Sequence, residues 1–217
     1  MLKEEGTSDN VTEVMNRPMN RRIAQGAATR RHLLEVATGL FTDQGYEQTS
    51  IEDVLRTAGV SRGSLYHHFA GKDRLFEAVV EHVEEEIIVT RLVAAASRHR
   101  DPVRMLRAGC AEWIALVDDP TVRQVVLTDA PAVLGWQRWR EIDERYGFGL
   151  MKDALTAVAA AGRMPESEVD VVGHLLLGAL NEAAMLVARS GASSRTRRHA
   201  LSAVDRLIDG FLRPPTG

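Results

Sequence analysis

Residues 49–72 have the sequence TSIEDVLRTAGVSRGSLYHHFAGK, and this segment decides the fold. Ser50 and Asp53 have the spacing of a capping box, in which each side chain accepts a hydrogen bond from a free backbone amide at a helix start. Apolar residues follow at positions 51, 54, 55 and 58, the spacing of one helical face. Gly59 can adopt the left-handed conformation that ends helices. The pattern predicts a short helix that ends in a tight turn.

A second short helix is expected after the turn, with Ser61 as its N-cap. Only Leu65 and Phe69 are apolar within residues 62–69, and they lie four positions apart on one side. The other side is polar and suits a groove of DNA, because Arg can pair with guanine, Ser and Tyr can bond phosphates or base edges, and Gly admits a close backbone. The pattern alone leaves one alternative, an amphipathic pair of surface helices. The residues expected to contact DNA are Thr49, Ser50, Ser61, Arg62, Gly63, Ser64, Tyr66, His67, His68 and Lys72.

The sequence GVSRGSLYHHFAGKDRLFEAVV, preceded by GLFTDQGYEQTSIEDVLRTA, resembles the DNA-binding domain of the tetracycline-repressor (TetR) family of bacterial transcription regulators. The resemblance covers about residues 27–80 and rests on the Leu-Tyr-x-His-Phe core, the Gly and the Lys at the family's spacing. It implies an all-α fold, a homodimer, and a C-terminal domain whose small-molecule effector releases the DNA operator. An unidentified effector is the only ligand implied, and no cofactor is expected.

Composition and charge are compatible with this expectation. The chain has 217 residues, 45% of them hydrophobic, which is enough for one or two compact domains. A single cysteine, Cys110, excludes a disulfide framework and suits a reducing cytoplasm. No membrane segment is expected, because no apolar run approaches the ~18 residues that a spanning helix needs. Although the net charge is −3, positions 15–75 hold nine basic and six acidic residues, so a basic excess accompanies the predicted helix-turn-helix.

We divide the chain into a mobile N-terminal tail (1–24), a helix-turn-helix domain (25–72) and a C-terminal regulatory and dimerisation domain (73–217) that starts with a connecting helix (73–97). Arg21 and Arg22 of the tail could follow the minor groove as an arm, or could simply be solvated. The first helix is expected at about 27–43, with Gly45 ending it. The connecting helix could carry movement between the two domains.

The last two helices, at about 167–189 and 195–212, are expected to form a dimerisation unit. The first is apolar almost all round, so it needs burial on two sides. Paired with the same helices of a second subunit, the two would form a four-helix bundle, and a two-fold dimer predicts a palindromic operator. The alternative is burial entirely within one chain. The expected interface residues are Leu175, Ala179, Leu186, Leu201, Val204, Leu207, Ile208 and Phe211.

Candidate ligand-pocket residues are the large apolar and polar side chains of the C-terminal domain. Each of them can also be explained as a core residue. His174 and Asn181 share one helical face, where they could orient a ligand or bond across the dimer interface. The pocket candidates are Met105, Trp113, Trp136, Trp139, Tyr146, Phe148, Met151, His174 and Asn181.

No catalytic or metal-binding motif such as HExxH or GxSxG is present, so we expect no enzyme. The acidic run Glu84, Glu85 and Glu86 is expected to be a solvated face. The sequence thus predicts a ligand-responsive DNA-binding regulator, most simply a homodimeric repressor. An activator, or a DNA-binding protein of the same fold that needs no ligand, remains as the alternative.

Overall fold

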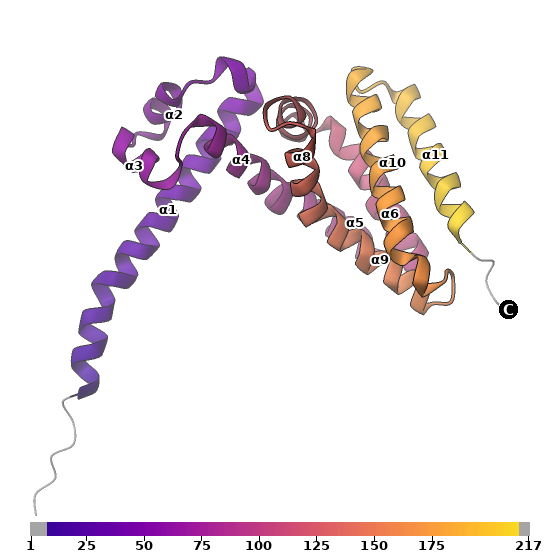
Figure 1. Ribbon diagram of the computed structural model, residues 1–217, viewed down its shortest axis with the longest axis horizontal. Coiled ribbons are helices and arrows are strands. Elements are labelled where there is room, and N and C mark those ends of the chain that lie inside the picture. The colour runs from indigo at the N-terminus through magenta and orange to yellow at the C-terminus, as the bar shows by residue number, and fades with distance from the viewer. Residues whose placement is uncertain (1–7, 213–217) are drawn as a thin grey trace, which may run out of the picture.

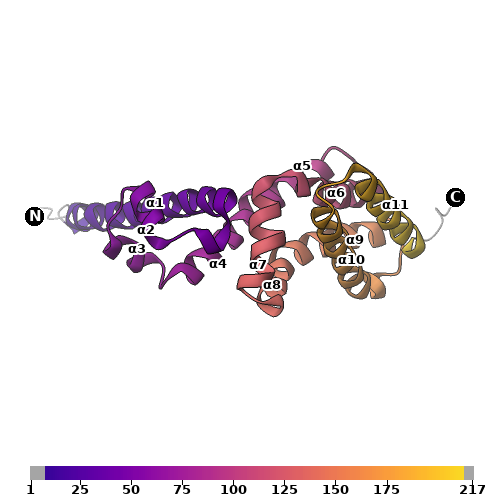
Figure 2. The same cartoon turned by 90° about the horizontal axis from the view of Figure 1, so that it is seen from above.

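The computed structural model describes the backbone of residues 8–212 and the side chains of residues 24–212. Every regular element within this range is helical, which confirms the predicted all-α fold. The helices form an N-terminal head (α1 to α4) and a C-terminal domain (α5 to α11), and the two parts lie at opposite ends of an elongated molecule (Figures 1 and 2).

Helix α1 (Ser8–Gln48) is interrupted near its end by Gly45, which has φ 76°. The helix starts at Ser8 and not at about residue 27, so the expected start of the first helix is corrected. The first half of α1 projects away from the rest of the chain (Figure 1), and a projecting helix needs no apolar stripe. Periodicity therefore could not reveal it. The side chains of Arg21 and Arg22 lie outside the described residues.

The head is completed by α2 (Ile51–Ala58), α3 (Arg62–His68) and the first turns of α4 (Lys72–Val83). The predicted capping box is present: the Asp53 amide donates to Ser50 Oγ, and the Ser50 amide donates to Asp53 Oδ2, both at 3.1 Å. Gly59 ends α2 with φ 65°, as expected. The four helices of the head are held by a buried apolar core that includes Leu33, Leu34, Ala37, Phe41, Val54, Leu65, Phe69, Leu75 and Phe76.

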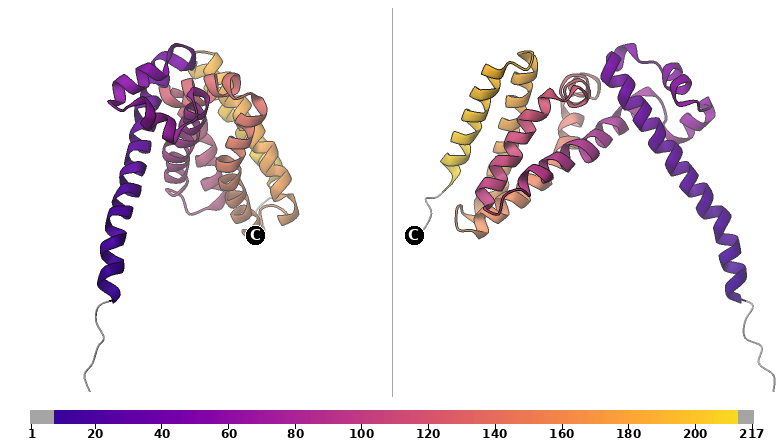
Figure 3. Two further views of the ribbon diagram at one scale, coloured as in Figure 1. Left: turned by 60° about the vertical axis from the view of Figure 1, so that its left-hand side comes forward. Right: turned by 180° about the vertical axis from the view of Figure 1, so that it is seen from behind.

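One long helical rod connects the head to the C-terminal domain. It consists of α4, the π-helical segment η1 (Glu84–Val89) and α5 (Thr90–Ala96), and it runs without a break (Figure 3, right). Its extent matches the connecting helix predicted at 73–97. The π-helical turn in its middle has no sequence signal that we recognised, and such turns often occur at functional sites.

After α5 the C-terminal domain continues with α6 (Pro102–Ala115), whose N-cap Asp101 accepts from the Arg104 amide at 2.8 Å. A break at Gly135, with φ 79°, separates its middle helices. The other elements are η2 (Leu116–Asp118), η3 (Val122–Asp129), α7 (Ala130–Val133), α8 (Trp136–Asp143), η4 (Glu144–Phe148), α9 (Gly149–Ala160), η5 (Glu166–Glu168), α10 (Val169–Arg189) and α11 (Ser194–Phe211).

Helix α10 is long and strongly apolar. A window within Glu166–Arg189 reaches a mean hydropathy of 1.6, long and apolar enough to cross a membrane by composition alone, so the expectation that no run approaches that length is corrected. However, 56% of the window is buried inside the chain, where α10 packs against α6, α9 and α11. Core helices with this much buried surface pass the same test, and the packing accounts for the composition.

Candidate nucleic-acid interface and internal cavity

Helix α3 presents a polar face on the surface of the head. Its apolar side is buried through Leu65, 0% exposed, and the following residue Phe69, 4% exposed, which confirms the predicted orientation. Arg62, Gly63, Tyr66 and His67 are exposed, while Ser64 and His68 are half-buried. A short helix oriented in this way can place several polar side chains and a bare backbone in the major groove.

Several hydroxyl groups near α3 form hydrogen bonds within the head itself. Thr49 is only 1% exposed, and its Oγ1 donates to the Gly45 carbonyl at 2.9 Å, so the expected direct DNA contact by this side chain is corrected. The Ser50 hydroxyl is engaged with Asp53 in the capping box. Ser61 caps α3 by accepting from the Ser64 amide at 3.2 Å. Thr49 thus ties the start of α2 to α1, while Ser50 and Ser61 cap the starts of α2 and α3.

Arg62 forms an ion pair with Glu52 of α2, which the sequence pattern did not reveal. Both side chains remain exposed, 59% and 60% respectively, so the pair is screened by water and weak. Glu52 therefore holds the guanidinium near the face of α3 at small cost, and Arg62 can exchange this carboxylate for a guanine edge.

Lys72 lies at the junction of the head with the rod. Its Nζ sits 3.9 Å from the centre of the Tyr46 ring, a cation–π contact. Tyr46 also donates its hydroxyl to Asp73 and its amide to Asp129 Oδ2, the latter at 2.8 Å. Lys72 is thus oriented by packing at a helix start, where it can meet a phosphate as a point charge.

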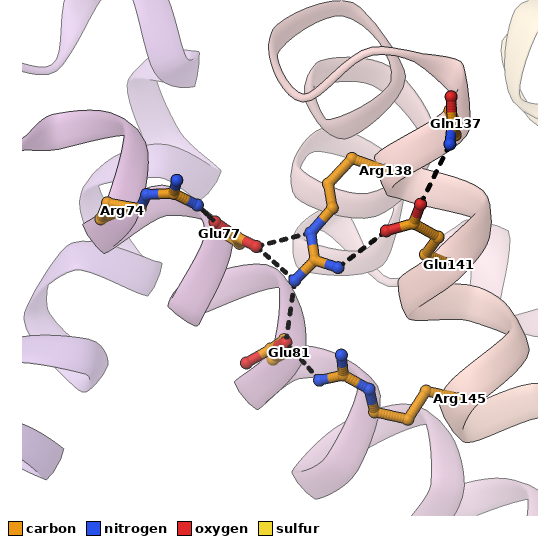
Figure 4. A network of polar contacts seen from close by, with 7 residues as sticks. All are labelled: Arg74, Glu77, Glu81, Gln137, Arg138, Glu141 and Arg145. Atoms are coloured by element: carbon orange, nitrogen blue, oxygen red, sulfur yellow. Dashed lines mark hydrogen bonds and ion pairs between the residues drawn. The ribbon is translucent and has the colours of Figure 1, made fainter.

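Charged side chains join α4 to α8 in a network that we call the α4–α8 clamp: Arg74, Glu77, Glu81, Arg138, Glu141 and Arg145 (Figure 4). Arg138 Nε donates to Glu77 Oε1 at 2.6 Å, and Arg145 Nη1 donates to Glu81 Oε1 at 2.7 Å. Burial alone would raise the pKa of Glu77, but the hydrogen bonds from Arg74 and Arg138 outweigh it and lower that pKa. Glu77 is therefore a buried, charged anchor between the two domains.

An internal cavity of about 120 Å³ lies where the end of the rod meets α6, η4, α9 and α10. Four predicted pocket residues line it: Met105, Trp113, Met151 and Asn181. The other five do not. Trp136 is exposed, Trp139 is buried elsewhere in the core, Tyr146 packs beside that core, and Phe148 stacks on the exposed His174 at 4.0 Å. Helical spacing identified the right helices but not which of their faces enclose the cavity.

Two carboxyl groups in the cavity were missed. Glu84 is 3% exposed whereas Glu85 and Glu86 are exposed, so only part of the acidic run is a solvated face. Burial, and then the charge of Asp143, raise the pKa of Glu84 to about 8. Burial raises the pKa of Asp143 to about 6, against the opposing hydrogen bond from Asn181 Nδ2 at 2.6 Å.

The far end of the molecule carries an apolar surface on α10 and α11, which lie side by side (Figures 1 and 2). Leu175, Leu186 and Leu207 are 56%, 49% and 43% exposed, and Val171, which the sequence reasoning did not select, is 63% exposed. Ala179, Leu201 and Phe211 are half-buried. Two expected interface residues are corrected: Val204 and Ile208 are buried within the chain, because the stripe they share with Leu201 packs against the chain's own helices.

A helix-turn-helix head with a polar recognition helix, linked to a helical domain with its own cavity, defines a DNA-binding regulatory protein. The family profile described as "Bacterial regulatory proteins, tetR family" matches residues 33–79, and "Tetracyclin repressor-like, C-terminal domain" matches residues 103–211. The second match alone spans half of the chain. The chain belongs to the TetR family of transcriptional regulators.

Individual relatives agree with this assignment. The chain is 40% identical over 79 residues to the HTH-type transcriptional regulator AcrR of Shigella flexneri, and the match spans 36% of this chain and 37% of that protein. A TetR-family regulator from Pectobacterium atrosepticum shares the fold with a TM-score of 0.77 and 30% identity, over 89% of this chain and 98% of the other. The SmeT–triclosan complex is similar with a TM-score of 0.64 and 23% identity, over 86% and 92% of the two chains. SmeT is the repressor of a Stenotrophomonas maltophilia multidrug efflux pump.

We expect Arg62 and Lys72 to contribute differently to DNA binding. Arg62→Ala should change which operator bases are tolerated, at a cost of about 1–3 kcal/mol at the affected position, because a bidentate base contact is lost. Lys72→Ala should weaken binding to all sequences alike and reduce the salt dependence, because a phosphate contact is lost. Binding titrations on a set of operator variants at several salt concentrations distinguish the two, and equal losses on every sequence for both variants would refute the division of roles.

The buried Glu84 predicts a pH-dependent stability. Its folded-state pKa lies near 8 and its ordinary value near 4.5, so the folded protein holds the proton more tightly and loses stability as pH rises between these values. Asp143, whose pKa burial raises to about 6, should also reduce stability as pH rises, over a lower pH range than Glu84. The Cys110 thiol, whose pKa burial raises to about 12, stays protonated throughout. Urea denaturation between about pH 5 and about pH 8 should show this loss for the native chain and a smaller one for Glu84→Gln; parallel curves would exclude Glu84 as its source.

Proposed function

We propose that the protein is a homodimeric, effector-released repressor that binds a palindromic operator in the bacterial cytoplasm. The observation that carries this proposal is the single helical rod from Lys72 to Ala96. Its first residue lies beside the DNA-binding head, and Glu84, one residue past the end of α4, lines the cavity. An occupant of the cavity therefore touches the same rigid element that positions the recognition helix.

The dimer is supported by the apolar surface of α10 and α11. Exposed leucines at positions 175, 186 and 207, together with Val171, form an apolar patch of a kind that soluble proteins usually cover. A two-fold axis through this surface would pair each helix with its own copy in a four-helix bundle. Two heads related by that axis would then contact two operator half-sites one DNA turn, roughly 34 Å, apart.

Release of the operator would follow from a change in the angle of the rod. The α4–α8 clamp joins α4 to the helix that ends at Asp143, and Asp143 lines the cavity. A ligand that moves Asp143 or Glu84 would thus move α4 through direct contacts, and the two heads would lose the spacing that the operator demands. The structure of SmeT with triclosan shows that a protein of this fold can hold a small molecule.

The repressor hypothesis predicts a shift of the DNA upstream of the protein's own gene in a gel assay. The shift should require both halves of a palindromic sequence, because each head binds one half-site. Addition of an effector should abolish it. A mutated half-site that leaves the shift intact would contradict the dimeric operator complex, and activation of transcription by the bound protein would favour the activator alternative.

A charge in the proposed interface should separate the subunits. Leu207→Glu places a carboxylate in the middle of the apolar surface, so we expect monomers in sedimentation velocity and loss of operator binding, since a single head makes too few contacts. Arg206→Glu is the matched control, because Arg206 is exposed and, among the described residues, bonds Ser202 in the preceding turn of its own helix. An intact Leu207→Glu dimer would place the interface elsewhere.

A further inference from the structure

The polar groups described in the cavity lining include two acids and no basic side chain. Glu84 and Asp143 both line it, yet among the described residues no Lys, Arg or His does. The Glu84 carboxyl group makes no hydrogen bond or ion pair within that part of the chain, and Asp143 has one bond, from Asn181. A buried carboxyl group without a partner costs free energy, so the site is incomplete as the chain alone builds it.

A second, independent observation points to a missing partner. Asn181 is 2% exposed and spends its amide nitrogen on Asp143, which leaves its Oδ1 buried without a hydrogen-bond donor. The indole of Trp113 also lines the cavity, with its Nε1 likewise unpartnered. The acidic pair and the Asn181 oxygen together offer acceptor atoms that no lysine, arginine or histidine among the described lining residues meets.

The rest of the cavity wall is apolar. Ile88 and Leu92 from the rod, Leu106 from α6, Leu150 from α9, and Leu177 and Leu180 from α10 supply it. An occupant must therefore combine a polar group for the acceptors with a hydrocarbon body for these side chains.

We propose that this cavity binds a lipophilic organic cation, an alkyl or aryl ammonium group carried on an apolar body. The ammonium group would lie between Glu84 and Asp143 with Asn181 Oδ1 as a further contact, and the Trp113 ring could face the cation. The inference rests on the proposed effector site and names the chemical class that the site selects.

Charge excludes the opposite class of amphiphile. A fatty carboxylate would bring a third acidic group to a cluster that contains no base, and Arg140, whose charge acts on Asp143, lies outside the lining and pairs with Glu144 at 3.1 Å. A neutral alcohol of the same length would fill the apolar part but leave the acidic pair unbalanced.

Binding of an ammonium cation should also displace a proton. The positive charge favours the ionised form of Glu84, so the proton that burial holds on this group would pass to the solvent. Asp143 and Cys110 are the other titratable groups in the cavity lining, and Asp143 would contribute at lower pH.

The test uses three probes of one chain length, decylammonium, 1-decanol and decanoate, titrated into the full-length protein by calorimetry in buffers of different ionisation enthalpy. We expect the cation to bind at least about tenfold more tightly than the alcohol, equivalent to about 1.4 kcal/mol, with decanoate weakest. We also expect net proton release for the cation alone. Equal affinity for the three probes, or tighter binding of decanoate, would overturn the proposal.

Variants identify the residues that produce the preference for a cation. Glu84→Gln should reduce cation affinity about tenfold and remove most of the proton release, while decanol binding stays within about twofold. Glu85→Gln is the matched control, since this neighbour is exposed, and it should change neither. Asp143→Asn should also weaken cation binding. Loss of all three probes together in Glu84→Gln, with the fold intact by circular dichroism, would show a structural role and refute charge recognition.

The same samples separate the inference from the function on which it rests. An operator gel shift is run with each probe at saturating concentration. Selective cation binding with an intact operator complex would uphold the ligand class and refute effector release through this cavity. Operator release by other compounds, without selective cation binding, would uphold the regulator and refute the ligand class.

Discussion

Burial of a single face of α4 is the constraint on which the rest of the molecule depends. Leu75, Phe76, Val79, Val80 and Val83 are all 0% exposed, and each contributes about 1.5–3 kcal/mol through removal from water. Bending α4 between these residues would expose several of them at once, so the helix responds to force as a unit. The head and the C-terminal domain therefore share one stiff helix, and a signal between them can pass as its displacement, alongside the direct contacts of α1 with η3.

Polar contacts alternate with the apolar packing along the rod. The clamp residues Glu77 and Glu81 face α8, and Glu84 follows after one more helical turn at the start of the π-helical segment η1. Asp143 directly precedes the second π-helical segment of this region, η4, which contacts η1. Each buried acid thus stands beside a locally widened helical turn. A ligand that changes the charge of Glu84 or Asp143 would therefore act at an irregular stretch of backbone. The clamp residue Glu81 lies one helical turn before Glu84.

The helix-turn-helix could be predicted almost residue by residue because its signals are local. Caps at Ser50 and Ser61, the left-handed Gly59 and the pair Leu65 and Phe69 act over three or four residues, and the chain realises each of them. The predicted DNA contact of Thr49 was wrong because the local sequence does not show which group its hydroxyl bonds. A hydroxyl group looks alike in sequence whether it meets a phosphate or a carbonyl of the preceding helix, as it does at Gly45.

The amino-acid sequence thus determined the family, the fold class and the recognition helix, since these depend on spacing along one helix and on short motifs. The tertiary structure alone decided which acid of the run from Glu84 to Glu86 is buried, which aromatic residues enclose the cavity and which leucines stay exposed on α10 and α11. The physical reason is that burial depends on neighbours from other helices. Glu84 and Asp143 lie far apart in sequence and share a cavity because the rod and α8 meet there. The apolar spacing within either helix does not predict that the two helices pack together.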